Sequence, residues 1–233
     1  MNLREAVRTR RSVHQYSDES LSRETIREIV DDARFAPSGY NLQPWEFLVL
    51  DEQSDQETLR EVAYEQEHVT EAGAAVVVFG NTDPAAHAEA VFDDWLDKGY
   101  LPGEEVKQGL LENVAGMADL PEAERRVWTT RSSSLAAMTL MLAAWDRGVA
   151  SCPMEGFDAD GLVDAFDVPD GYEPVMLVTL GYPAEGADDV DNDRKARRSV
   201  DEITHFGSFD PVSETDVAET ETTEAVEAVK ADD

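Results

Sequence analysis

The segment from Thr129 to Arg147 constrains the fold of this chain most strongly. From Leu135 to Trp145 every residue except Thr139 is apolar. A helix of this composition is apolar around most of its circumference, so it must be covered on nearly all sides. We therefore expect it either at the centre of the fold or in a subunit interface, and the sequence does not separate the two. Gly148 is expected to end the helix as its C-terminal cap.

The remaining elements follow from caps, spacing and turn residues. Asn2 is expected to cap a helix that ends near Arg10, and a second helix is expected to begin after Ser22 and to stop before Pro37. Short β-branched or aromatic runs predict strands at Trp45–Leu50, Ala74–Phe79 and Pro174–Leu180. Pro and Gly predict a helix-rich insertion, Ala85–Gly116, that is broken around Gly99–Gly103, and a loop, Ser151–Phe157, before a helix that Asp158 begins.

Composition divides the chain into two parts. Residues 1–212 are expected to form one globular domain, whereas residues 213–233 are acidic, contain no aromatic residue and are expected to be a disordered tail. Weakly spaced apolar residues in the tail leave a helix open as an alternative.

The charge balance restricts the partners. The chain has 19 Lys and Arg against 51 Asp and Glu, for a net charge of −32. Binding to nucleic acid or to an anionic membrane needs positive surface, so neither is expected. The charge indicates a salt-rich cytoplasm, with an ordinary acidic protein as the alternative. Cys152 is the only cysteine, no apolar run reaches about 18 residues, and no signal peptide is evident, so a cytoplasmic protein is expected.

The scarce cations are clustered. Eight of the 19 basic residues lie in two short stretches near opposite ends of the chain: Arg4, Arg8, Arg10 and Arg11, then Arg194, Lys195, Arg197 and Arg198. Guanidinium groups bind phosphate oxygens in bidentate fashion, and Ser12 adds a hydroxyl donor. The clusters predict a site for a phosphorylated ligand, and salt bridges to surface carboxylates are the alternative for any single arginine.

Two further segments fit a heterocyclic ligand. The chain has neither a GxGxxG turn nor a P-loop, so side chains must hold the phosphate. The stretch Ala36–Trp45 places Ser38, Asn41 and Gln43 before a strand, and amides of this kind recognise imide edges and hydroxyl chains. In Ser151–Phe157, backbone N–H groups left free at a turn can donate to an electron-rich ring atom. Taken singly, each segment is equally consistent with an ordinary loop.

Together these segments resemble the nitroreductase family of flavin enzymes over residues 2–206. The resemblance lies in Arg10-Arg11-Ser12, in the Ala-Pro-Ser-x-x-Asn-x-Gln-Pro-Trp string of residues 36–45, in the loop of residues 148–156, and in Lys195-x-Arg197. It implies an α+β sandwich with a mixed, mainly antiparallel sheet flanked by helices, and an intertwined homodimer with FMN at the interface.

The resemblance also implies site residues. Arg10, Arg11, Ser12, Lys195 and Arg197 would bind the phosphate and ribityl end of FMN. Pro37, Ser38 and Asn41 would reach that flavin from the other subunit, Glu155 and Gly156 would offer N–H groups to N5 and O4, and Pro153 would pack near the ring.

Two positions depart from the family pattern. His14 stands where the family usually has Lys or Arg facing the flavin pyrimidine, so its charge would depend on protonation. Farther along, Gln66 stands at the usual Asn position, and Val69 at that of a later Lys. Losing permanent charge there is expected to lower the reduction potential.

The implied activity is flavin chemistry without a side-chain nucleophile. NADH or NADPH would deliver hydride to FMN N5 and leave, and a small electron-poor acceptor such as a nitroaromatic or a quinone would follow in a ping-pong mechanism. The insertion would cover the acceptor pocket, and its Phe92, Trp95 and Tyr100 fit an aromatic acceptor and a core patch equally well. A reductive dehalogenase-like or flavin-destructase-like enzyme, or a flavin-binding protein without turnover, remains an alternative. The histidines show no metal-site spacing, and no metal is expected.

Overall fold

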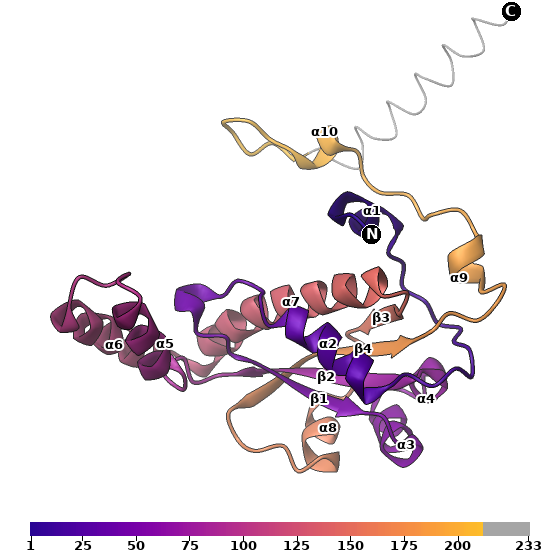
Figure 1. Cartoon of the computed structure of the whole chain (residues 1–233), viewed down its shortest axis with the longest axis horizontal. Helices are drawn as coiled ribbons and strands as arrows, with labels where there is room; N and C mark the ends of the chain where they lie inside the picture. The colour runs from indigo at the N-terminus through magenta and orange to yellow at the C-terminus, as the bar shows by residue number, and fades with distance from the viewer. Residues whose placement is uncertain (212–233) are drawn as a thin grey trace, which may run out of the picture. The chain divides into compact units, whose positions relative to one another are not determined.

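The computed structural model describes residues 1–211, which contain an antiparallel sheet and the helices around it (Figure 1). The strands are β1 (Trp45–Leu50), β2 (Ala74–Asn81), β3 (Ala150–Met154) and β4 (Tyr172–Gly181). The helices, with one 3-10 turn, are α1 (Leu3–Thr9), α2 (Arg23–Ala33), η1 (Gly39–Asn41), α3 (Gln53–Val62), α4 (His68–Glu71), α5 (Ala88–Asp97), α6 (Glu104–Ala118), α7 (Glu122–Asp146), α8 (Ala159–Ala165), α9 (Asp188–Asp191) and α10 (Val200–Ile203). None of the helices within this range is long and apolar enough to cross a membrane.

The four strands lie in the order β1-β2-β4-β3, and each neighbouring pair is antiparallel. Pairing brings Trp45 opposite Gly80 at one end of β1, and Met154 opposite Leu177 where β3 ends. One parallel bridge, Ser12 to Ser151, adds the N-terminal segment beside β3. The predicted α+β fold with a mainly antiparallel sheet is confirmed.

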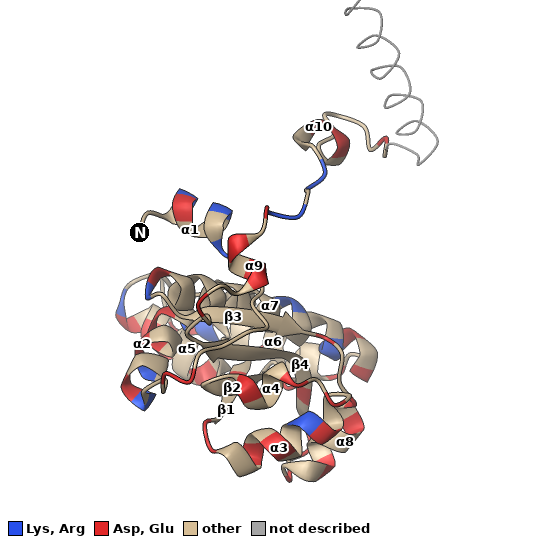
Figure 2. Cartoon of the chain, turned by 90° about the vertical axis from the view of Figure 1, so that its right-hand side faces the viewer, with Lys and Arg blue, Asp and Glu red and all other residues tan. Residues whose placement is uncertain are grey.

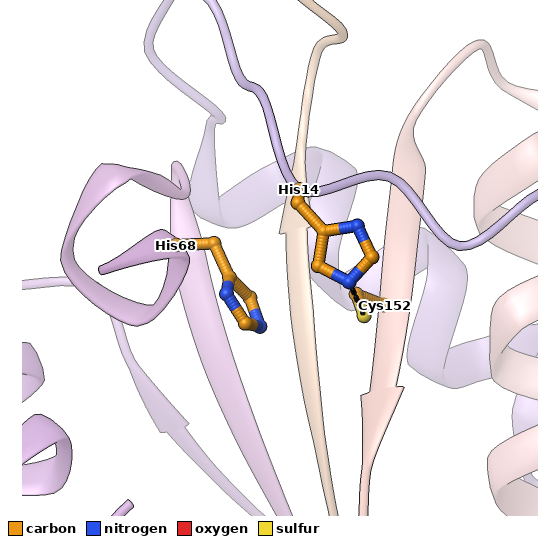
Figure 3. A group of neighbouring side chains, drawn as sticks. All are labelled: His14, His68 and Cys152. Carbon is orange, nitrogen blue, oxygen red and sulfur yellow. Dashed lines mark hydrogen bonds between the residues drawn. The ribbon is translucent and has the colours of Figure 1, made fainter. Parts of the chain in front are cut away.

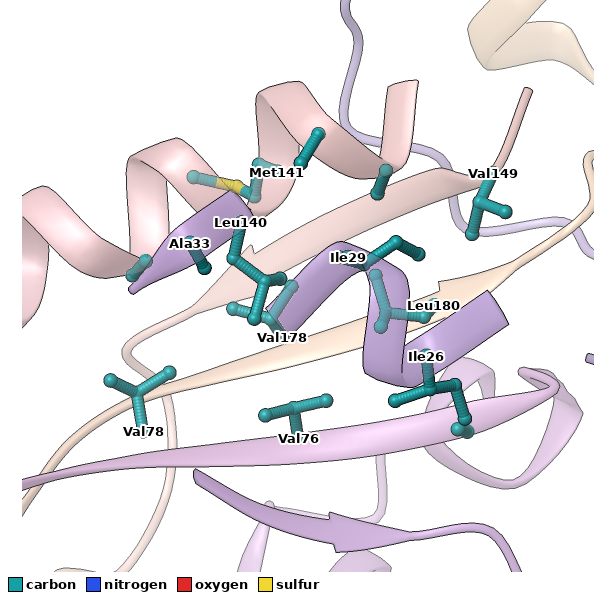
Figure 4. Packing of buried hydrophobic residues seen from close by; sticks show 14 of the residues in the cluster. Ile26, Ile29, Ala33, Val76, Val78, Leu140, Met141, Val149, Val178 and Leu180 are labelled. Carbon is teal, nitrogen blue, oxygen red and sulfur yellow. The ribbon is translucent and has the colours of Figure 1, made fainter. Parts of the chain in front are cut away.

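Both faces of the sheet are covered by helices. Every residue of β2 is buried, and alternate residues face opposite sides: Val76 and Val78 pack with α2 and α7, whereas Val77 and Phe79 pack toward α3, α4 and α8. Figure 4 shows the first of these layers, with Leu140 of α7 packed over the sheet strands. The buried position of β2 explains why its sequence reads as a continuous apolar run.

The long helix α7 crosses β2 closely at Gly80. A Cβ atom added to Gly80 would lie 2.8 Å from Cγ2 of Thr129, which is closer than real Cβ contacts allow. Next to this crossing, the hydroxyl of Ser133 donates to the carbonyl of Phe79 at 3.3 Å. The small residue at position 80 therefore sets the distance between helix and sheet.

Several sequence predictions are confirmed at the level of single residues. Asn2 and Ser22 cap α1 and α2 through their side chains, Asp158 caps α8, and β1 spans Trp45–Leu50 as predicted. The insertion forms α5 and α6, separated around Gly99–Gly103.

Two predictions need correction. The expected loop at Ser151–Phe157 is wrong in its first half, because residues 150–154 form β3. Proline is tolerated on an edge strand, and β3 is at the edge, so Pro153 did not exclude a strand there. The predicted helix from Thr129 begins seven residues earlier, at Glu122. In this single chain its Leu135 is 47% and its Met138 38% exposed, and the alternative of a subunit interface stays a prediction.

The chain divides into two compact units, the first from Met1 to Asn192 and the second beginning at Asp193. Within the second unit, α10 begins with a capping box in which Ser199 and Glu202 each bond the other's backbone N–H. The predicted tail, residues 213–233, lies outside the described residues, and the predicted boundary at residue 212 stays a prediction.

Leu140→Ala should test the α7 layer. Leu140 is fully buried against the sheet, so its truncation leaves a cavity and should lower the free energy of unfolding by about 2–5 kcal/mol. Leu3→Ala makes the same chemical change at a side chain that is 72% exposed, and should change stability by less than about 0.5 kcal/mol. Urea unfolding followed by circular dichroism measures both, and equal losses would contradict the packing described.

Candidate functional site

The segment after α1 runs along the edge of the sheet. Arg10 ends α1, and the backbone N–H of Val13 donates to the carbonyl of Ser151 in β3 at 3.1 Å. The Val13 side chain is fully buried, and side chains of an extended segment alternate in direction. Ser12 and His14 therefore point away from the core beside β3.

His14 is held by a carboxylate on one side and faces a thiol on the other. Its Nδ1 donates to Oδ2 of Asp189 in α9 at 2.8 Å, and the same oxygen accepts from the His14 backbone N–H at 3.0 Å. Because a carboxylate only accepts, this bond places a proton on Nδ1, and the neutral tautomer of this ring carries its lone pair on Nε2. Nε2 lies 3.4 Å from Sγ of Cys152.

His68 of α4 completes this cluster (Figure 3). Its ring meets the His14 ring edge to face, with centroids 4.9 Å apart, and its Nε2 lies 3.2 Å from Sδ of Met154. Burial of the imidazole, and then the nearby His14, lower the pKa of His68 below its ordinary value. The neutral form of His68 is thereby favoured at neutral pH.

Gln66 ties the loop after β3 to the segment before α4. Its side-chain amide donates to the carbonyls of Gly156 and Ala63, both at 2.9 Å. Within residues 1–211, the backbone N–H groups of Glu155 and Gly156 donate no hydrogen bond to the protein. Two donors are therefore available at the end of β3, on the sheet edge that also carries Ser12.

The loop with Pro37, Ser38 and Asn41 lies elsewhere. It precedes β1, which forms the opposite edge of the sheet from β3. Pro37 and Ser38 border a cavity of about 290 Å³ with Trp128 of α7, and Asn41 borders another of about 440 Å³ beside α5. One chain therefore does not bring this loop to the edge where Ser12 lies.

The backbone of this loop is unusual. Tyr40, Asn41 and Gln43 all have positive φ angles, between 48° and 56°. The hydroxyl of Ser38 accepts from the backbone N–H of Gln43 at 2.9 Å, which closes the turn. Non-glycine residues in this region cost conformational free energy, and such residues cluster at ligand sites.

Of the expected acceptor-pocket residues, two belong to the core of the insertion. Phe92 is fully buried and packs edge-on against Trp95, with centroids 5.4 Å apart. Tyr100 is 75% exposed. Trp95 is partly buried against this core. The aromatic residues of this segment therefore mainly reflect packing, and Tyr100 is the most exposed of the three.

The basic residues stand out against an acidic chain in Figure 2, where blue ribbon marks α1 and the stretch between α9 and α10. Lys195 and Arg197 belong to the second unit, in which Arg197 donates to the carbonyls of Lys195 and Ala196 at 3.0 Å. That they converge with Arg10 and Arg11 on one phosphate stays a prediction.

The sequence reasoning missed three members of the cluster, namely His68, Cys152 and Asp189. Val69, which stands where the family usually has a Lys, is fully buried with Leu59, and its neighbour His68 is the α4 side chain that faces His14. The apolar character of Val69 before a buried strand was the one available signal that position 69 points inward.

Comparison with known proteins agrees with this architecture. The family model described as "Nitroreductase family" matches residues 7–182. A Bacillus subtilis protein named as an NAD(P)H nitroreductase, YodC, is 34% identical over 187 residues, which cover 80% of this chain and 92% of the relative. An NADH dehydrogenase of Thermus thermophilus is 32% identical over 192 residues, covering 79% and 88%.

Solved structures give the same result. A Bacillus subtilis structure described as the nitroreductase YdfN superposes with a TM-score of 0.80 at 25% identity, covering 87% of this chain and 97% of that one. A nitroreductase structure from Exiguobacterium sibiricum, in complex with FMN, has a TM-score of 0.78 at 30% identity and covers 88% and 97%. The resemblance inferred from four short motifs is confirmed, and the chain belongs to the nitroreductase family.

Proposed function

We propose that this protein is an FMN-dependent oxidoreductase that uses NADH or NADPH to reduce small electron-poor acceptors such as nitroaromatics and quinones. The relatives named for NAD(P)H-linked activity and the FMN complex of a structural neighbour support the cofactor and the reductant. The observation that carries the proposal is the pairing of the Ser12–His14 segment with β3. It places a hydroxyl and an imidazole on the same sheet edge as the available N–H groups of Glu155 and Gly156.

The donor set at this edge fits a flavin mononucleotide. Arg10, Arg11 and Ser12 offer guanidinium and hydroxyl donors for a phosphate, to which Lys195 and Arg197 would add charge. The N–H groups of Glu155 and Gly156 would donate to the N5 and O4 side of the ring, where negative charge develops on reduction.

Three further residues would shape the ring site. Pro153 would pack against the ring, and His14 would face its pyrimidine end. Gln66 would act indirectly, since its bond to the Gly156 carbonyl fixes the loop that carries the two N–H donors.

Two copies of the chain would complete the site. Pro37, Ser38 and Asn41 lie at the sheet edge opposite to Ser12, so a second subunit is needed to bring this loop to the flavin. The exposed Leu135 and Met138 on α7 are apolar surface of the kind that a subunit interface covers. A homodimer with α7 in its interface satisfies both features.

When bound, FMN would supply the hydride chemistry between NAD(P)H and the acceptor in a ping-pong sequence. The residues of the chain bind and orient the ring, and no side chain needs to act as a nucleophile. Asp189 holds the His14 ring in place through the bond to Nδ1, and Gln66 holds the donor loop. The net charge of −32 favours function in a salt-rich cytoplasm, where surface repulsion is screened.

The purified protein is expected to bind FMN and to be reduced by nicotinamide. Added FMN should remain with the protein on gel filtration, and its visible absorbance should bleach when NADH or NADPH is added without oxygen. Reoxidation by a quinone or a nitroaromatic should restore it. Titrations with NADH and with NADPH identify the preferred reductant. Repeating them at high and low salt shows whether flavin reduction requires salt. A chain that stays colourless after incubation with FMN would contradict the proposal.

His14→Lys should raise the reduction potential of the bound flavin. A permanent cation at the pyrimidine end stabilises the reduced anion, and each 1.4 kcal/mol of added stabilisation raises the two-electron potential by about 30 mV. Ser54→Lys adds the same charge on α3, where solvent and salt screen it, and should leave the potential unchanged. Anaerobic dye-linked titration measures both, and an equal shift in the two variants would refute a local role for position 14.

A further inference from the structure

Three side chains that the flavin proposal does not use as a set converge from separate parts of the first unit. His14 comes from the segment after α1, His68 from α4 and Cys152 from β3, and Figure 3 shows them facing one another. One potential ligand atom from each of them lies within 4.8 Å of the others. These residues are far apart in sequence, so no sequence motif predicts the cluster.

The geometry is close to that of a zinc site. With bonds of about 2.0–2.1 Å to nitrogen and about 2.3 Å to sulfur, two ligands of a tetrahedral ion lie about 3.5 Å apart. The separation between Nε2 of His14 and Sγ of Cys152 is 3.4 Å. The ligand atoms of the cluster lie within 4.8 Å of one another, so the widest pair would have to approach by about 1.3 Å to reach this spacing. Rotation of the partly buried His68 ring would bring its nitrogen closer.

The surroundings also suit a metal ion. Metal-bound histidines usually donate their second ring N–H to a carboxylate, which orients the ring and raises its basicity. Asp189 already makes this bond to Nδ1 of His14, which directs the lone pair of Nε2 toward Cys152. A second sulfur, the thioether of Met154, borders the cluster beside His68.

We propose that, in the flavin-free chain, His14, His68 and Cys152 bind one Zn²⁺ ion. The two neutral imidazoles each donate a lone pair, and the thiol of Cys152 loses its proton to solvent as sulfur bonds to the ion. The His14 side chain is 45% exposed, so water can reach the fourth position. Thiolate and imidazole ligands select a borderline-soft ion over Mg²⁺ or Ca²⁺, which prefer oxygen.

His14 belongs both to this cluster and to the proposed flavin site. The metal proposal is therefore tested on the full-length chain after flavin has been removed, and its outcome does not depend on whether the protein reduces any acceptor. Because 51 acidic residues offer weak sites for any cation, the readout must report the thiolate itself.

Co²⁺ is the probe that reports a thiolate ligand. One equivalent should give a near-ultraviolet thiolate-to-cobalt charge-transfer band together with the visible bands of a tetrahedral ion, and Zn²⁺ should displace it. Cys152→Ser should remove the charge-transfer band, and His87→Gln, outside the cluster, should leave it intact. A native chain that binds Co²⁺ without a thiolate band would overturn the proposal.

Asp189→Ala provides a test that leaves all three ligands in place. Loss of the carboxylate that orients His14 should weaken Zn²⁺ binding by about 10–100-fold. Asp188→Ala removes the same charge from the same short helix and should leave the affinity unchanged. Competition titration with a chelating dye measures both constants, and circular dichroism verifies folding. Equal weakening by the two substitutions would mean that acidic surface, and not this cluster, holds the ion.

Discussion

The pairing of the Ser12–His14 segment with β3 is the interaction on which the candidate site depends. One backbone bond, from Val13 to Ser151, and the complete burial of the Val13 side chain fix this segment against the edge of the sheet. The alternation of side chains then determines that Ser12 and His14 face outward. This pairing places Ser12 and His14 at the sheet edge where β3 leads into the loop of Glu155 and Gly156.

The order of the strands explains why the predicted flavin contacts lie at two opposite edges of the sheet. β3 and β1 are the two edges of the same sheet, so the loop before β1 and the segment beside β3 are separated by β2 and β4. In the proposed function, the loop before β1 would reach the flavin at the β3 edge from a second copy of the chain. The apolar residues that α7 leaves exposed, Leu135 and Met138, are consistent with that requirement.

The sequence predicted most of the first unit because local signals agreed with the final packing. Capping residues Asn2, Ser22 and Asp158 marked helix starts, and the β-branched apolar run of residues 74–79 predicted the strand β2. β3 was missed because Pro153 argues against a strand unless the strand is known to be at an edge, and edge position is a property of the whole sheet.

The candidate site was predictable only where its members are adjacent in sequence. The loop pattern predicted free backbone N–H groups within residues 151–157, and the family resemblance assigned them to Glu155 and Gly156. The His14–His68–Cys152 cluster was not identified, since its three members meet only through the pairing of distant elements.

The clustered cations need compensating negative charge. In a chain with 51 acidic residues, cations held together must be compensated by a ligand or by neighbouring acids. We propose that Arg10 and Arg197, from opposite ends of the chain, both bind the phosphate of one mononucleotide. Riboflavin has the same ring but lacks that phosphate. Comparing its affinity with that of FMN therefore distinguishes binding of the phosphate from binding of the ring.

The decisive measurement is the affinity for FMN and for riboflavin of the native chain, of Arg10→Ala, of Arg197→Ala and of the double variant. If both guanidinium groups bind the phosphate, each single substitution should weaken FMN binding by about 10–100-fold, as expected for a charged hydrogen bond. Riboflavin binding should not change, and the two losses should be non-additive because the groups share one partner. Equal affinities of the native chain for FMN and riboflavin, or losses that affect both ligands alike, would contradict the account.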